Sequence, residues 1–184
     1  QDVGVRFYTY ISTMHYVMEA CGESDTRFLV LDRPNPNGFY VDGPVLDTAY
    51  RSFVGMHPIP VVHGMTIAEL GRMINDQGWL KDGIRCEYEW VACKNYTHDS
   101  LYHLPVAPSP NLPDMRSIYL YPSLGLLEGT VYNVGRGTET PFQLFGHPDM
   151  KAGEITYIPR AIEGASTSPK YKGQVCQGID LRKY

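Results

Sequence analysis

Segments with helical periodicity alternate with short apolar runs in the first 95 residues, and this alternation constrains the fold more than any other feature of the chain. Apolar side chains recur at spacings of three and four over residues 10–23, which predicts an amphipathic helix with Gly22 as its C-terminal cap. Residues 27–32 (RFLVLD) then form a short apolar run that ends in an acid. Such a run is typical of a buried parallel strand whose carboxyl end opens onto a site.

The same pattern repeats further along the chain. Thr66 and Glu69 have the spacing of a capping box, and the apolar residues after them predict a second helix, which Trp79 closes. Apolar and polar side chains alternate over residues 84–93, which predicts a second full strand. Residues 1–4 resemble the end of an earlier strand. Over residues 1–95 we therefore expect an α/β fold, the second half of a doubly wound parallel sheet.

The composition changes after Asn95. Proline-rich turns precede an apolar segment at residues 119–127, and residues 153–183 predict two or three strands joined by a polar loop at 163–172. Residues 96–184 are thus expected to form part of a smaller α+β domain.

Several function classes lack support. The net charge is −4 with no block of basic residues, so nothing favours nucleic-acid binding. The longest apolar runs, such as residues 28–31, fall far short of the roughly 20 residues of a membrane span. We expect neither nucleic acid nor membrane insertion, and no feature of the chain indicates an oligomeric state.

Cofactor and metal motifs are missing from the sequence as well. The four cysteines form no CxxC pair, and His57 and His63 lack a third ligand at a recognisable spacing. Neither a dinucleotide-binding Gly-x-Gly-x-x-Gly nor a Gly-x-Ser-x-Gly nucleophile elbow occurs. We therefore predict no metal and no cofactor.

The densest polar clusters, residues 32–38 (DRPNPNG) and 41–44 (VDGP), follow the predicted strand at residues 27–32. They begin a stretch of about 30 residues without periodicity, and a loop of that length inside a domain is usually functional. Its Asp, Arg and Asn side chains suit a ligand with many hydroxyl groups. A rigid turn with Asx caps accounts for the same residues equally well.

Two charged residues elsewhere have both a structural and a functional interpretation. Glu19 lies beside the apolar stripe at the end of the first predicted helix, where a carboxylate faces the negative end of the helix dipole. From the residues alone a tolerated surface glutamate is the simpler interpretation, and a partly buried catalytic acid is the alternative. Arg136, between two glycines, could pair with a carboxylate through both of its terminal nitrogens.

Seven strings in this order resemble the exo-β-N-acetylmuramidase family, long catalogued as a domain of unknown function. The strings are residues 1–10 (QDVGVRFYTY), 31–36 (LDRPNP), 41–44 (VDGP), 63–66 (HGMT), 108–111 (PSPN), 128–130 (EGT) and 135–138 (GRGT). The resemblance spans essentially the whole chain but only about half of the family's length. It implies a Rossmann-like N-terminal domain, entered midway, and a smaller C-terminal domain. The chain also starts without Met, so we expect an internal fragment of a longer protein.

The family removes N-acetylmuramic acid from the non-reducing ends of peptidoglycan fragments, which implies a periplasmic or secreted bacterial enzyme. A glycosidase of this kind needs two catalytic groups, usually carboxyl groups. One family glutamate lies in a Pro-Glu-His-Gly stretch that this sequence does not contain, so the isolated chain is expected to be inactive. The resemblance places the other on the first helix, at Glu19, and no cofactor is implied.

The resemblance also implies a set of groups that bind the saccharide or its lactyl carboxylate. These are Asp2, Arg6, Tyr8, Asp32, Arg33, Asn35, Asp42, His63, Asn111, Glu128 and Arg136. The alternative is a non-catalytic module that only binds peptidoglycan-derived saccharides.

Overall fold

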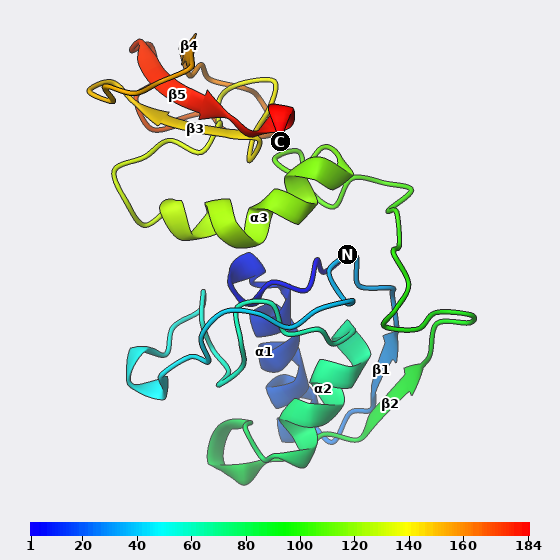
Figure 1. Ribbon diagram of the computed structural model, residues 1–184. Coiled ribbons are helices and arrows are strands. Elements are labelled where there is room, and N and C mark those ends of the chain that lie inside the picture. Colours follow the sequence, from blue (N-terminus) through cyan, green and yellow to red (C-terminus); the bar gives the residue numbers. More distant parts are fainter. The chain divides into compact units, whose positions relative to one another are not determined.

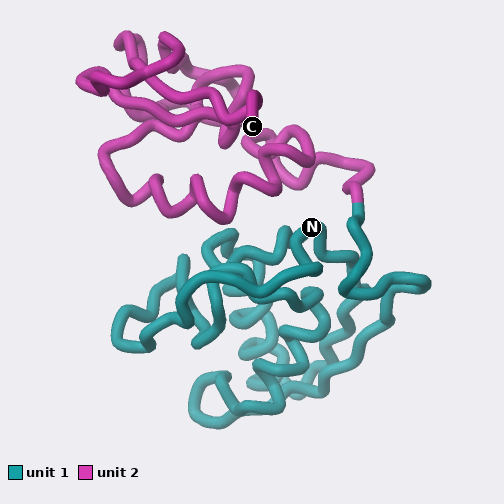
Figure 2. Tube along the Cα trace, in the orientation of Figure 1, with its two compact units in different colours: residues 1–102 teal, residues 103–184 magenta.

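Helices and strands alternate through the first of the two compact units into which the chain divides, residues 1–102 and 103–184 (Figures 1 and 2). The structure is a computed structural model that describes all 184 residues. The boundary expected between residues 95 and 96 lies within unit 1. Tyr96 and His98, on the far side of that boundary, hydrogen-bond back to Asn35 and Glu69.

Unit 1 is built on two helices and two strands. These are α1 (Tyr10–Glu23), β1 (Phe28–Leu31), α2 (Ile67–Asp76) and β2 (Tyr88–Val91), with 3-10 turns at Arg6–Tyr8, Thr48–Tyr50 and Lys81–Gly83. The two strands pair in parallel, from Phe28 opposite Tyr88 to Leu31 opposite Val91 (Figure 1). Because α2 lies in the connection between them, the predicted α/β class and parallel pairing are confirmed.

Two predictions about the sheet are wrong. Residues 1–4 form no strand, and their neighbour Val5 makes only a single bridge to Val62. Strand β1 is also not buried on both faces, since Leu29 and Leu31 are 51% and 68% exposed. Successive side chains of a strand point to opposite faces, and only the face that carries Val30 packs against the helices.

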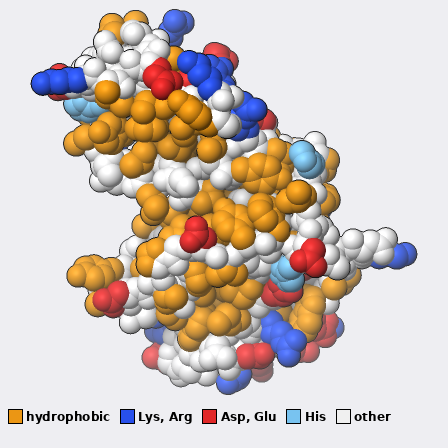
Figure 3. All heavy atoms as spheres, in the orientation of Figure 1, with side chains coloured by type: hydrophobic (Ala, Val, Ile, Leu, Met, Phe, Trp, Pro, Cys, Tyr) orange, Lys and Arg blue, Asp and Glu red, His pale blue; other side chains and the backbone are white.

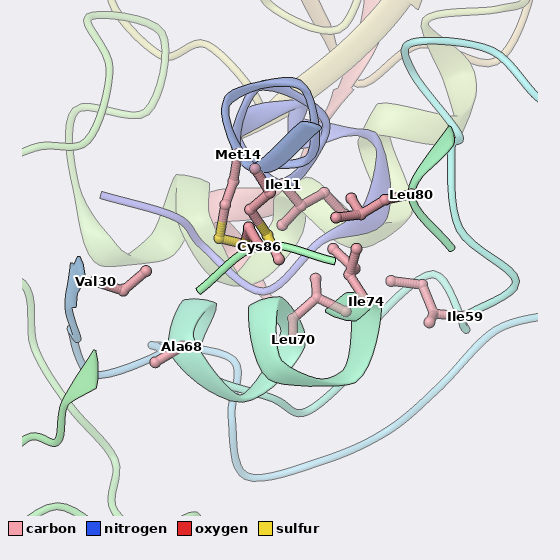
Figure 4. Close-up of a cluster of buried hydrophobic side chains, with 10 residues drawn as sticks. Ile11, Met14, Val30, Ile59, Ala68, Leu70, Ile74, Leu80 and Cys86 are labelled. Atoms are coloured by element: carbon pink, nitrogen blue, oxygen red, sulfur yellow. The ribbon is translucent and has the colours of Figure 1, made fainter. Parts of the chain in front are cut away.

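The core of unit 1 lies between α1, α2 and the inner face of β1 (Figure 4). Its buried side chains are Ile11, Met14, Met18, Val30, Ile59, Ala68, Leu70, Ile74, Leu80 and Cys86. The α1 and α2 members recur at spacings of two to four residues, so each helix directs one face inward. This packing fixes which side chains of α1 point away from the core, Tyr16 and Val17 among them.

The helix ends agree with the sequence in one case and not in the other. The predicted capping box of α2 is present, with Thr66 and Glu69 each accepting from the other's backbone N–H. Gly22, by contrast, lies inside α1 and does not cap it. A Cβ at Gly22 would collide with the side chain of Ile84, so close packing requires this glycine. Ser24 ends the helix, and its N–H and hydroxyl both donate to the carbonyl of Ala20.

Unit 2 combines one helix with a small antiparallel sheet. It contains α3 (Met115–Leu127), β3 (Leu144–His147), β4 (Ile155–Tyr157), β5 (Cys176–Asp180) and a 3-10 turn at Leu181–Lys183. The strand order is β3-β5-β4. The apolar segment at residues 119–127 is therefore most of α3, which Asp114 and Ser117 cap reciprocally. Two strands occur in the predicted range, and the third, β3, precedes it.

Hydrophobic side chains cover much of the face shown in Figure 3, with charged side chains between them. Over unit 1 as a whole, the exposed hydrophobic side chains include Tyr16, Val17 and Phe53. None of the helices has the length and apolar character that crossing a bilayer requires. The structure also shows no group of three or more side chains suited to holding a metal ion.

Candidate active site

An open cleft of about 780 Å³ lies beside the middle of α1. Its lining comes from α1, from the segment around the Thr48–Tyr50 turn and from the segment that enters the Lys81–Gly83 turn. It includes His15, Tyr16, Glu19, Arg51, Phe53, Trp79, Lys81 and Asp82. The cleft thus brings two acids, a base, two cations and three aromatic rings to one surface.

Glu19 is fixed in the wall of this cleft with 16% of its side chain exposed. Its Oε1 accepts two hydrogen bonds, from the backbone N–H of Lys81 at 2.8 Å and from Nε2 of His15 at 3.1 Å. The contact with His15 follows from the helix, because residues four apart share one face. These two donors offset the unfavourable place of a carboxylate at a helix C-terminus and hold it in one orientation.

The histidine that contacts Glu19, His15, also contacts a second histidine, His57. Nδ1 of His15 lies 3.0 Å from Nε2 of His57, whose side chain is completely buried. Burial, with the nearby positive charge of Arg51 and the other histidines, lowers the pKa of His57 to about 3. Burial also lowers the pKa of His15, against the opposing effect of Glu19. Both imidazoles are therefore neutral at pH 7.

Three aromatic rings line the cleft. Tyr16 and Phe53 stack with their planes 5° apart and their centroids 6.2 Å apart, and both are about half exposed. Trp79 packs across His57 at 5.7 Å. Exposed ring faces next to fixed polar groups are the lining that small-molecule sites commonly have.

A second polar cluster, formed by Asp2, Asn35 and His63, is buried in unit 1. Oδ2 of Asp2 accepts from the N–H of Gly4 at 2.7 Å and lies 3.7 Å from Nε2 of His63. Burial raises the pKa of Asp2 and lowers that of His63. A buried carboxyl group beside a histidine, both with shifted pKa values, is a feature of functional sites as well as of structural networks.

Three of the residues implied as saccharide ligands, Asn35 of this cluster among them, hold the backbone of unit 1 in place. Arg6 donates to the carbonyls of Pro44 and Ile59, and Asn35 donates to Met65. Asp32 accepts from the N–H of Ala68 at 3.1 Å, at the start of α2.

The remaining three in unit 1 make more local contacts. Arg33 donates to Gln1, and Asp42 accepts from the N–H of its own neighbour, Gly43. Tyr8 makes an edge contact with the ring of Tyr10.

In unit 2 the three implied residues also have partners within the chain. Nδ2 of Asn111 donates to the carbonyl of Ala165 at 2.9 Å. Nε of Arg136 donates to Glu128 at 2.6 Å, and its guanidinium lies 4.9 Å from the centre of the Phe142 ring. The group expected to bind a lactyl carboxylate is thus paired with a carboxylate of its own unit.

The structure therefore brings together Asp2, Asn35 and His63, with Asp32 at the start of α2, but it does not bring Glu19 to them. The lining of the cleft that holds Glu19 contains none of these four residues.

Three residues around Glu19 were not predicted as part of a site: His15, its hydrogen-bond partner His57, and Trp79. The spacing of four between His15 and Glu19 is visible in the sequence. No local signal could reveal His57, which is 42 residues from His15.

Fold and site together describe a two-unit α/β protein with a carboxylate–histidine pair in an aromatic cleft. The chain belongs to the exo-β-N-acetylmuramidase NamZ family, which confirms the resemblance noted in its sequence. The family's N-terminal domain matches residues 1–116, and its C-terminal domain matches residues 119–184.

Three relatives support this assignment. The peptidoglycan β-N-acetylmuramidase NamZ of Bacillus subtilis (strain 168) is 43% identical over 196 residues, which covers 98% of this chain and 46% of that protein. The crystal structure of a DUF1343 family protein of Bacteroides fragilis NCTC 9343 matches with a TM-score of 0.96 and 52% identity, over 100% of this chain and 52% of the other. A second from that strain matches with a TM-score of 0.84 and 30% identity, over 98% and 50%. The chain thus spans about half the length of each relative.

Proposed function

We propose that this protein is a glycoside hydrolase that releases N-acetylmuramic acid from the non-reducing ends of peptidoglycan fragments during cell-wall turnover. The Bacillus subtilis relative is named as a peptidoglycan β-N-acetylmuramidase, which supports the reaction and the substrate class. Because peptidoglycan lies outside the cytoplasm, we propose that the protein acts in the periplasm or outside the cell.

The observation that carries the proposal is the carboxylate of Glu19, oriented by His15 and Lys81 in the wall of the cleft. Hydrolysis of a glycosidic bond requires protonation of the leaving oxygen and a nucleophile or base on the other side of the sugar ring. Glu19 would supply one of these two functions. The stacked Tyr16–Phe53 pair offers an apolar surface for a sugar ring next to it.

Substitution of Glu19 tests this assignment in the protein at its full natural length. The substrate is the disaccharide of N-acetylmuramic acid linked to N-acetylglucosamine, and free N-acetylmuramic acid is quantified over time. We expect Glu19→Gln to lower kcat by roughly 10²-fold or more, as removal of a general acid or base does. Glu23→Gln, on the same helix and exposed, is the matched control and should retain wild-type turnover.

Asp2→Asn provides the competing arm of the same experiment. Asp2 is the other carboxyl group of unit 1 that is buried beside a histidine. If Asp2→Asn abolishes turnover while Glu19→Gln leaves it intact, the catalytic carboxyl group belongs to the buried cluster and Glu19 is rejected.

A saccharide-binding module is the second candidate, and the exposed Tyr16–Phe53 pair favours it because aromatic faces bind sugars without any proton transfer. It predicts binding of the disaccharide by wild type and by Glu19→Gln, with no release from either. Release by wild type excludes it.

A further inference from the structure

His15 and His57 form a continuous hydrogen-bonded chain that ends at Glu19, and the proposed function so far assigns no role to it. The two contacts measure 3.0 Å between the imidazoles and 3.1 Å between His15 and the carboxylate. Each imidazole has two nitrogens, so the protons on this chain are restricted by what each nitrogen faces.

The carboxylate end determines the direction of the chain. Oε1 of Glu19 already accepts from the N–H of Lys81, so it also acts as the acceptor toward His15. Nε2 of His15 must then carry a proton. Because burial keeps His15 neutral, its Nδ1 has none and accepts. Nε2 of His57 therefore donates to it.

The buried end of the chain is consistent with this direction. Nδ1 of His57 has no hydrogen-bond partner and is enclosed in the interior. If His57 donates to His15, Nδ1 of His57 is an unpaired acceptor. If His15 donated to His57 instead, Nδ1 of His57 would be a buried, unpaired N–H. Unpaired acceptors are the more readily tolerated of the two in protein interiors. The ring of Trp79 stacks on His57, with the two centroids 5.7 Å apart.

We propose that His57 is a positioning residue: by donating Nε2–H to His15 it holds His15 in the Nε2–H tautomer and so directs the His15 N–H at Glu19. An oriented histidine next to an acid is the arrangement that general acid–base sites use, with a third group that fixes the tautomer. An effect of His57 on turnover rests on the function proposed for Glu19. The assignment of the His15 tautomer does not depend on that function.

The first test measures the tautomers of the two histidines directly in the protein. Long-range ¹⁵N–¹H correlation spectra of the labelled chain at pH 7 distinguish the two neutral tautomers of each histidine. We expect His15 and His57 both to be Nε2–H. Observation of His15 as the Nδ1–H tautomer, or as an imidazolium, would overturn the proposal.

Two substitutions of His57 separate the donated hydrogen bond from packing. The amide of His57→Gln can place an N–H where the imidazole Nε2 lies, whereas His57→Leu fills the space without a donor. We expect His15 to keep its tautomer in His57→Gln and to become a mixture in His57→Leu. If His57→Leu fails to fold, His57→Asn serves as the second variant, because its shorter amide does not reach His15. An unchanged His15 tautomer without a donor at position 57 would refute the proposal.

Turnover of the full-length protein gives the second readout. His57→Leu should lower kcat about 10-fold with little change in KM, and His57→Gln should recover most of the loss. The charged and titratable groups that act on the two histidines are Glu19, Arg51 and His63, and Lys81 and Asp82 line the same cleft. If the tautomers are as expected but wild type hydrolyses nothing, the proposed function fails and the positioning of His15 stands. If His57→Leu turns over like wild type, the positioning role in catalysis is refuted.

Discussion

Nδ1 of His15 and Nε2 of His57 lie 3.0 Å apart in the interior of unit 1, although 42 residues separate them in the chain. His15 belongs to α1, and His57 to the irregular segment that closes over that helix. Two polar rings are thus buried against each other where a hydrophobic contact would also have filled the space. This is costly unless their nitrogens pair, and pairing links both rings to Glu19.

The first prediction concerns pH and stability. Since burial lowers the pKa of His57 from 6.5 to about 3, the unfolded chain binds a proton at a higher pH than the folded one. The stability that neutral His57 allows is therefore fully present above pH 6.5 and declines as the pH falls toward 3, by at most about 1.4 kcal/mol per pH unit. His57→Gln should lack this contribution.

Urea unfolding followed by tryptophan fluorescence at several pH values measures it, because both tryptophans, Trp79 and Trp90, belong to unit 1. As the pH falls, the free energy of unfolding of wild type should decrease more than that of His57→Gln. A constant difference from pH 7 to pH 4 would contradict a buried neutral His57.

The second prediction concerns Gly22. In an exposed helix, replacement of glycine by alanine stabilises by about 0.5–1 kcal/mol. Here the new methyl group would collide with the side chain of Ile84. We expect Gly22→Ala to destabilise unit 1 by about 1–3 kcal/mol, as overpacking does, and Gly22→Ala combined with Ile84→Ala to recover part of that loss. Increased stability of the single variant would show that Gly22 makes no close contact.

The third prediction concerns the core between the two helices. Ile74 is fully buried in α2 and Ile11 in α1, in one cluster (Figure 4). Ile74→Ala should lower the free energy of unfolding by about 2–5 kcal/mol through lost burial and the cavity that remains. Val17→Ala, on the exposed side of α1, should change it by less than about 0.5 kcal/mol. Similar effects of the two variants would contradict this packing.

The fourth prediction tests Arg136 as the ligand of the lactyl carboxylate. Oε1 of Glu128 lies 2.6 Å from Nε of Arg136 and pairs with its guanidinium. Glu128→Gln removes this negative charge and should leave Arg136 free to pair with an external carboxylate. We expect tighter binding of N-acetylmuramic acid to Glu128→Gln, and no change for N-acetylglucosamine, which lacks the lactyl group. Titration calorimetry with both sugars measures this. Equal effects on the two sugars would make the Glu128–Arg136 pair purely structural.

Much of the local structure could be predicted from the sequence because its causes are short-range. The periodicity of residues 10–23 predicts α1, and the Thr66–Glu69 spacing predicts the start of α2, since caps and helical stripes depend on neighbours within one or two turns. The apolar runs similarly predict the two parallel strands, and the ordered strings predict the family.

The tertiary structure decided everything that depends on what packs against those elements. From its residue type and position, Gly22 is expected to cap the helix. The structure shows instead that a glycine is needed there because Ile84, 62 positions later, packs against it. Leu29 and Leu31 have the pattern of a buried strand, yet their exposure depends on which face of the sheet the helices cover. His57 becomes a partner of His15 only because the chain folds back over α1, and burial, which no local pattern encodes, then keeps both rings neutral.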